Sequence, residues 1–528
     1  MNNNQAPANE KPGDSSYEYN TDLGVVYTIF SDFLVDAPYS IEAIQGFIKH
    51  PMEHNRELRE FAWWAYRSNG SVTSAVDYMR TMHTLDGVAV CKTQKSNGRK
   101  PSNFDRNRSK MLKVLNSIRY KQAIRDALLK DANDGIYFGY FELSSTSLNI
   151  LPKYLSDAEV YNVREINQTD INATIITLPV DYCKIIGRKN NSYVMAFDLK
   201  YFLQFAEPDL QRRVAAFPKE IRDAWEAYSS PGSKVRGSWV RLDNKHTIIT
   251  KIKSGIDEPW GVPVSVCALD DILYAEYFTN TKRRVLDQLN NVIIYETFPE
   301  GKEKGRCALT DKQQKAQHDT VKSALLSRSN QMGMTFFSLA SGTKLDKISV
   351  DTSIFDEKNE AAIQDAVPAD LGIASSSLNG NTKGNYATAT LNMELVAGNV
   401  YSWICDFMIE LNKCVNALVI RDPSCVVDFQ ILPTTYVNRD KFFGYMKTLY
   451  SDCGGSLQAL VAASGMDVDG YISMMEYERD NDFDERFTPH QSMYTQSATA
   501  GRPSVDSDNP NTVQSKSNNG NASPKPST

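Results

Sequence analysis

The spacing of apolar residues changes along the chain, and each spacing predicts a different kind of element. Between residues 56 and 81 apolar side chains recur every three or four positions, as on one face of a helix. Residues 135–250 instead hold short β-branched and aromatic runs between turn signals, with one helical segment at 217–228. This part of the chain is therefore expected to be an α+β body. The apolar faces predicted for its first two helices are Leu58, Phe61, Ala62, Ala65 and Tyr66, and then Val72, Ala75, Val76 and Met79.

The second half of the chain alternates long helical patterns with a few short strands. A Thr310–Gln313 capping box precedes one helix, and Ser353 and Pro368 are expected to start and stop another. The linker at 372–386 contains three glycines and precedes the longest apolar helical pattern. The predicted elements are, in order, helix 265–290, strand 291–298, helix 311–327, strand 334–340, helix 353–367, helix 387–419, strand 424–432 and helices within 438–480.

The composition is that of a globular chain with polar ends. The chain has 41% apolar residues and a net charge of −6, which argues against non-specific wrapping of nucleic acid by a basic surface. We expect no transmembrane helix, no secretory signal and disorder at residues 1–20 and 491–528, which are rich in Asn, Ser and Pro. The eight cysteines have no CxxC spacing, so reduced thiols are expected.

The common catalytic and cofactor motifs are absent from the sequence. There is no GxxxxGK[ST] phosphate loop, no HExxH, no GxSxG nucleophile elbow and no GxGxxG. A nuclease would need clustered carboxylates to hold a divalent metal, whereas the acidic run at 356–360 lies on one charged helix. We therefore expect no enzymatic activity, no cofactor and no metal site.

Two segments have strongly unbalanced charge. Residues 92–130 hold twelve Lys and Arg against two Asp, which fits either a solvated helix face or contact with an acidic partner, another subunit or nucleic acid. Residues 351–370 hold six Asp and Glu against Lys358. This acidic segment also fits a solvated helix face.

Several segments, in this order along the chain, resemble tailed-bacteriophage portal proteins. Residues 178–185 and 197–202 look like the family's body strands, and 261–263 leading into 269–272 looks like the start of its first stem helix. Residues 455–476 look like its final helical region, and the Ser/Asn-rich tail is also typical. The similarity covers residues 23–485, and the order of the elements is more specific than any single segment.

The resemblance implies an α+β portal-protein fold that assembles as a ring. Its parts would be a disordered N-terminus (1–20), the wing (21–264), a first stem helix (265–291), a β-α-β clip (292–344), a second stem helix (345–371), a tunnel loop (372–386), a long wing helix and strand (387–433), a helical crown (434–490) and a disordered tail (491–528).

The function that the resemblance implies is structural. About twelve copies would form a ring-shaped channel at one capsid vertex, through which viral double-stranded DNA is packaged and ejected. The implied partners are the terminase large subunit, the major capsid and scaffolding proteins, and head-completion or tail proteins. The protein would belong to the virion, and to the host cytoplasm during assembly, with no membrane contact.

The resemblance also assigns roles to individual residues. An acidic channel wall would not grip a polyanion, whereas one ring of Lys383 would make weak, exchangeable phosphate contacts. The tunnel-loop residues are Ser375, Ser376, Asn379 and Lys383; the channel-wall residues are Asp356, Glu357, Glu360 and Asp365; and the clip interface residues are Ile293 and Phe336.

Two other interpretations remain open at this point. The chain could be another ring-forming head–tail adaptor, although adaptors are generally much shorter. It could also be a nucleic-acid-processing subunit with an unrecognised active site. A ring with an axial hole would favour the portal over the enzyme.

Overall fold

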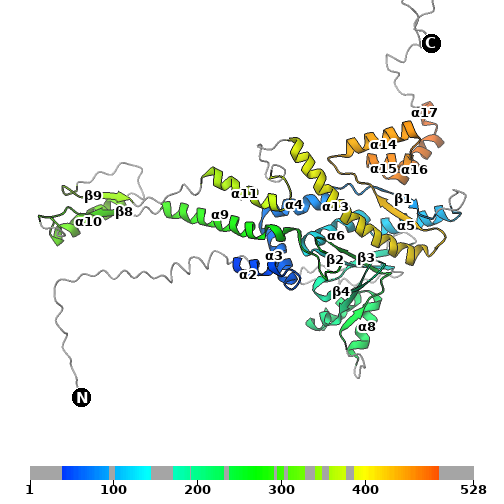
Figure 1. Ribbon diagram of the computed structural model, residues 1–528, viewed down its shortest axis with the longest axis horizontal. Helices are drawn as coiled ribbons and strands as arrows, with labels where there is room; N and C mark the ends of the chain where they lie inside the picture. The colour runs from blue at the N-terminus through cyan, green and yellow to red at the C-terminus, as the bar shows by residue number, and fades with distance from the viewer. Residues whose placement is uncertain are drawn as a thin grey trace, which may run out of the picture.

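The computed structural model describes residues 39–93, 101–143, 171–190, 192–207, 209–230, 237–290, 294–302, 307–326, 339–347, 356–375 and 386–486. An α+β body carries an arm of two helices that projects to one side and ends in a small unit of strands and a helix (Figure 1). A group of short helices lies on the other side of the body, near the C-terminus.

Five helices form the first layer of the body: α2 (Ile41–Lys49), α3 (Asn55–Ser68), α4 (Gly70–Thr81), α5 (Phe104–Ser117) and α6 (Tyr120–Asp134). The apolar faces predicted for α3 and α4 are buried, apart from Tyr66, which is half-buried. Asn69 caps α4 by accepting hydrogen bonds from the amides of Ser71 (3.0 Å) and Val72 (3.2 Å). The local sequence pattern is thus sufficient to define these two helices.

The central strand of the body, β2 (Ile136–Leu143), separates two apolar cores. It pairs antiparallel with β3 (Ala173–Thr177) and with β7 (Thr247–Lys251). Alternate side chains of a strand point to opposite faces. Tyr137 and Phe141 therefore join the core beneath the helices. Ile136, Phe138 and Tyr140 join a second core on the other face.

The second core belongs to a lobe of three strands and two helices: β4 (Cys183–Lys189), β5 (Ser192–Asp198), β6 (Trp239–Arg241), α7 (Asp209–Ala216) and α8 (Lys219–Ser229). The strands are antiparallel in the order β4-β5-β6. Aromatic rings fill the core, and Phe202 lies 6.0 Å from Phe197 and 5.0 Å from Phe217 between ring centres. The α+β body expected from the sequence is therefore present.

The long helix expected at 387–419 is α13 (Tyr386–Val415), continued by a π-helical turn, Asn416–Ile420. It packs against β7 and against β10 (Val427–Ile431), which pairs antiparallel with β1 (Gly87–Cys91). Val400, Ile404 and Phe407 are buried. Leu391 and Leu395, which share the apolar spacing, are instead 59% and 65% exposed, because they lie on the other side of the helix.

The arm runs out along α9 (Leu269–Asn290), through β8 (Ile294–Thr297), α10 (Asp311–Leu326) and β9 (Lys344–Lys347), and back along α11 (Glu357–Asp370). The strand that pairs with β8 is β9, in antiparallel register. The sequence pattern predicts the second strand closer to the N-terminus, at 334–340. Residues 334–338 lie outside the described residues, and residues 339–340 are not in a strand.

The prediction that Pro368 stops its helix was wrong by one turn. Pro368 lies inside the last turn of α11. There its ring removes only one helical hydrogen bond, and the amide of Leu371 still donates to the carbonyl of Val367 (3.1 Å). The predicted start at Ser353 lies outside the described residues.

Four helices, which we call the crown helices, follow β10: α14 (Arg439–Cys453), α15 (Leu457–Ser464), α16 (Val468–Asp480) and α17 (Phe483–Arg486). They confirm the helices predicted from 438 to 480. Arg108 of α5 forms an ion pair with Asp469 of α16, which ties the crown helices to the body.

The basic segment 92–130 is partly neutralised by acids from distant parts of the chain. Besides Arg108, Lys121 pairs with Asp86 (2.6 Å) and Lys92 with Asp428 (2.5 Å). Three of its cations therefore hold this chain together. The segment therefore offers less free positive charge than its composition indicates, both for a solvated helix face and for contact with an acidic partner.

Candidate functional site

The arm leaves the body at a glycine contact that has no room for a side chain. A Cβ on Gly261 would lie 1.8 Å from the carbonyl oxygen of Gly135. Gly135 ends α6 with a φ of 73°, and its carbonyl also accepts a hydrogen bond from the amide of Ile252 (2.9 Å). The two backbones can approach this closely only because both residues are glycines.

A chain of buried polar side chains fixes the same joint. Asn55 donates from Nδ2 to the carbonyl of Gly261 (2.8 Å), and Arg59 donates from Nε to Oδ1 of Asn55 (2.9 Å). Arg59 also forms an ion pair with Asp181 (2.7 Å) in the second lobe. Asn55 and Arg59 are both buried, so their bonds to Gly261 and to each other are shielded from water, whereas the side chain of Asp181 is 43% exposed. The bonds made by the Arg59 guanidinium are charge-assisted. The helical layer, the second lobe and the start of the arm are thereby held together.

The base of the stem, which we define as α9 with α11, carries a cluster of acidic residues. Asp370 of α11 shares a hydrogen bond with Asp271 of α9. Burial, and then the hydrogen bond and negative charge of Asp271, raise the pKa of Asp370. Gln45 of α2 donates to Asp270 (3.3 Å), which ties the stem to the first helical layer. Two stem helices therefore meet through carboxyl groups close to the body.

The predicted channel-wall residues all belong to α11 or its first flanking position. Asp356 precedes the helix and is exposed, and Asp365 is half-buried. Glu357 and Glu360 lie in the helix, but their side chains are outside the described part of the chain. Their role as a channel wall stays a prediction.

The first residues of the predicted tunnel loop, 372–375, are described by the structure, and two of them are hydrogen-bonded to α13. Asn392 of α13 accepts a hydrogen bond from the amide of Ala374 (2.9 Å) and donates to the carbonyl of Gly372 (3.0 Å). Ser375 is half-buried, whereas Ser376, Asn379 and Lys383 lie outside the described residues. Asn392 thus holds the first residues of the loop against the helix that follows it. The sequence analysis missed this role, because an Asn within a helix has no local signal for a partner 18 to 20 residues away.

The unit at the tip of the arm is held together by one glutamine. Gln317 of α10 donates to Glu296 of β8 (2.6 Å) and to Thr343 beside β9 (3.0 Å), and accepts from the amide of Ala340 (3.2 Å). Half of the predicted capping box is formed at the start of α10, with Gln313 accepting from the amide of Thr310 (3.0 Å). The hydroxyl of Thr310 also donates to Gln313 (3.0 Å) and does not accept from the Gln313 amide, which donates to the carbonyl of Thr310. The predicted interface residues Ile293 and Phe336 lie outside the described residues.

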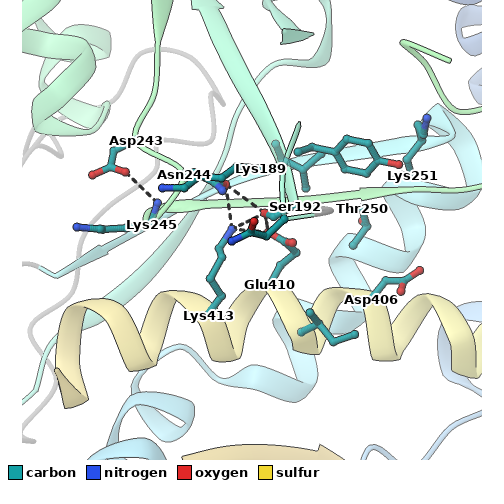
Figure 2. Close-up of a pocket in the computed structure, with 14 residues that line it drawn as sticks. Lys189, Ser192, Asp243, Asn244, Lys245, Thr250, Lys251, Asp406, Glu410 and Lys413 are labelled. Atoms are coloured by element: carbon teal, nitrogen blue, oxygen red, sulfur yellow. Dashed lines mark hydrogen bonds and ion pairs between the residues drawn. The ribbon is translucent and has the colours of Figure 1, made fainter. Parts of the chain in front are cut away.

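A cleft of about 570 Å³ lies between the turn of the β4–β5 hairpin, β7 and α13 (Figure 2). Lys413 of α13 points into a polar network at its floor. Its ammonium group donates to Ser192 (3.0 Å), Asn244 (3.2 Å) and the carbonyl of Thr247 (2.9 Å), and it forms an ion pair with Glu410. Lys413 thereby attaches the first residues of β5 and β7 to the long helix α13.

The Ser192–Lys413 pair was not singled out in the sequence, and it raises the question of nucleophilic chemistry. A serine nucleophile needs a neighbouring base that is free to take its proton. Here the hydroxyl of Ser192 donates to Glu410 (3.0 Å), and Lys413 is bonded to oxygens on all sides. The arrangement in Figure 2 is that of a saturated structural network.

The described residues contain no cluster of three or more His, Cys, Asp or Glu side chains suited to a metal ion. Within the same ranges, every helix is too short or too polar to cross a lipid bilayer.

Comparisons with solved structures find chains of weak overall similarity. No family model matches the sequence, and no curated protein is significantly similar to it. The neck of a native gene transfer agent particle matches with 11% identity and a TM-score of 0.42, covering 76% of this chain and 91% of that chain. The neck of the empty particle matches with 12% identity and a TM-score of 0.42, over 79% and 93%. An HK97-family phage portal protein from Corynebacterium diphtheriae matches with 12% identity and a TM-score of 0.31, over 70% and 94%.

Proposed function

We propose that this chain is a portal subunit, a structural protein that forms the channel at one vertex of a viral capsid. The observation that carries the proposal is the arm. Two helices, α9 and α11, leave an α+β body side by side, end in a small β8–α10–β9 unit, and return to a linker and a 30-residue helix (Figure 1). This is the order of stem, clip, tunnel loop and long helix that the sequence resemblance implies.

The small sheet at the tip of the arm has few stabilising neighbours in a single copy, and this supports assembly as a ring. Among the described residues, β8 and β9 pair only with each other, so both outer edges of the two-stranded sheet are open. A two-stranded sheet is marginal by itself, and open edges pair readily with other chains. In a ring of about twelve copies each arm would lie between two others, which would supply the missing packing.

In this proposal the stem lines the channel and double-stranded DNA passes along it. The acids of α11 would keep the wall from gripping the phosphates, and the tunnel loop would make weak contacts. The clip would receive head-completion or tail proteins, and the terminase large subunit would dock on the ring during packaging. The major capsid and scaffolding proteins would surround the body. The protein acts in the virion, after assembly in the host cytoplasm, and has no enzymatic step of its own.

Electron microscopy of the purified full-length chain, combined with native mass spectrometry, tests the proposal. We expect rings with an axial hole and a mass of about twelve subunits. A monomer without ring formation at any concentration, or a nuclease activity that needs a divalent metal, would contradict the portal function and favour the nucleic-acid-processing alternative.

A further inference from the structure

Among the described residues, the crown helices bury few apolar side chains. Their own core consists of Val461, Ala462 and Val468. None of the 15 residues of α14 is buried. Because helices in proteins gain most of their stability from packing an apolar face against a neighbour, the crown of a single copy lacks part of its packing.

A groove of about 400 Å³ lies between α13 and α14. Tyr401 of α13 and Phe442 and Tyr445 of α14 line it. Tyr445 is 71% exposed, and Leu391 and Leu395 are also exposed on α13. The aromatic rings share the groove with polar side chains, His83, Glu394, Asn438 and Lys441. A groove with aromatic side chains between two helices can accept the apolar face of a third helix, with polar contacts at its edges.

The helix α16 presents a face of the matching kind. Met474, Met475 and Tyr477 are 51%, 44% and 62% exposed. Methionine side chains adapt to irregular surfaces, and exposed methionines are common where proteins bind one another. With 13 residues α16 is about 20 Å long, which is close to the length of α14.

The charges beside the two surfaces are complementary. Lys441 and Lys447 are exposed on α14, and Glu476 and Glu478 are exposed on α16. Within the described residues, Lys447, Glu476 and Glu478 have no ion-pair partner, and Lys441 has only a long contact with Glu394 (3.5 Å). Opposite charges around an apolar contact fix its register and exclude other partners.

We propose that α16 of one copy occupies the α13–α14 groove of the next copy. The inference rests on the ring proposed above and adds which surfaces join neighbouring crowns. Because α15 packs against both α14 and α16, the groove wall and the inserted helix belong to one unit but are different surfaces. A contact between two different surfaces is head-to-tail, and such contacts close into rings when the rotation permits.

Cysteine cross-linking of the full-length chain tests the pairing directly. The background is Cys267→Ser, Cys307→Ser and Cys453→Ser, which removes the exposed cysteines of the described chain. Tyr445→Cys combined with Met474→Cys, treated with a short bis-maleimide, should give a ladder of covalent oligomers on a denaturing gel. Each single variant is the matched control and should stay at monomer mass. Rings visible by microscopy without any ladder would overturn the inference while leaving the proposed function intact.

Charge reversal supplies a second, independent measurement in the same cross-linking background. Lys441→Glu with Lys447→Glu should lower the ladder yield about tenfold, as should Glu476→Lys with Glu478→Lys. The combination of all four should restore most of the yield, because the charges are again opposite. Asp223→Lys on α8 is the control and should have no effect. Equal yields in all charge variants, or no rescue in the combination, would count against the pairing.

The chain's own C-terminal segment is the competing occupant. Removing residues 487–528 should leave the ladder unchanged if a second copy fills the groove. If instead the truncation makes Tyr445→Cys newly reactive to a thiol reagent in the monomer, the segment covers the groove and the inference is wrong. Absence of rings in the wild-type chain would be a failure of the proposed function, and is read separately by microscopy.

Discussion

At the scale of single residues, the contact between Gly261 and Gly135 holds the segment that leads into the arm against the end of α6. We expect Gly261→Ala to destabilise the chain by about 3 kcal/mol, because the new methyl group must displace backbone rather than a mobile side chain. The measurement is the thermal unfolding midpoint and the yield of soluble protein. Gly237→Ala is the matched control, since nothing described lies within 4 Å of its Cβ position. Equal midpoints for the two variants would show that the joint relaxes freely.

A buried carboxyl group next to this joint gives a prediction about pH. Asp131 of α6 accepts hydrogen bonds from the hydroxyl of Thr250 (2.9 and 2.7 Å) and is otherwise enclosed. Burial raises its pKa from 3.8 to about 7, with smaller contributions in the same direction from Asp134 and Asp406. The folded chain therefore holds this proton more tightly than the unfolded chain does, and Asp131 costs stability increasingly as the pH rises from 3.8 to about 7.

We expect Asp131→Asn to stabilise the chain at pH 8, by as much as about 4 kcal/mol, because the amide never ionises. The gain should shrink as the pH falls and vanish at about pH 3, below the unfolded-state pKa of 3.8, where the wild-type carboxyl group is protonated in both states. Thermal unfolding at several pH values measures it, with the exposed Asp223→Asn as control. A gain of equal size at pH 4 and pH 8 would mean that packing, and not ionisation, is responsible.

At the scale of elements, we expect the acidic charge of the stem helix α11 to affect the movement of DNA through the proposed channel. Glu360→Lys with Asp365→Lys changes the charge of α11 by four units per copy, and the ring would multiply this change. We expect rings to form but packaging to slow severely, because each new cation adds a salt-dependent phosphate contact. DNA packaged per particle over time is the measurement. Asp223→Lys with Glu226→Lys on α8, away from the arm (Figure 1), makes the same charge change and should package normally.

We expect assembly of the ring to depend on the clip. Ile293→Asp or Phe336→Asp should leave monomers or aggregates, because the open edges of the β8–β9 sheet need neighbouring copies. Light scattering measures the loss of rings. The exposed position Lys312→Asp on α10 changes the charge in the same unit and should leave assembly intact. Intact rings from both variants would indicate that Ile293 and Phe336 are not needed for assembly.

The sequence predicted the elements whose signals are local. The faces of α3 and α4, the capping box of α10 and the length of α13 follow from spacings within a few turns of helix. The strand β9, Lys344–Lys347, has only four residues and one apolar position among charges, so its pairing with β8 depends on the fold around it. The partners of Lys92 and Lys121 and the anchoring role of Asn392 likewise depend on distant segments, which periodicity does not encode.

At the scale of the whole molecule, the proposed portal function assigns the linker between the stem and the long helix to contact with DNA and not to assembly. Asn392 pins its first residues to α13, so the stem and the long helix remain joined at a fixed point even if the middle of the linker changes. Assembly surfaces proposed for the arm and the crown lie elsewhere in the chain. The linker can therefore be altered with little effect on the ring.

The final prediction follows from that separation. Deletion of 375–383, or Lys383→Glu, should permit rings and empty shells but lower the amount of DNA packaged or retained severalfold. Lys383 is the only charged residue of the loop. In the proposed channel each of its phosphate contacts would be weak and screened at cellular salt, so the contacts would act through their number around the ring. Lys383→Arg keeps the charge and is the matched control, expected to package normally. Counting full and empty particles by microscopy, together with the DNA content per particle, gives the measurement. Wild-type numbers of full particles from the deletion would show that the loop does not act on DNA, and failure of the deletion variant to form rings would show that the loop is instead part of the assembly surface.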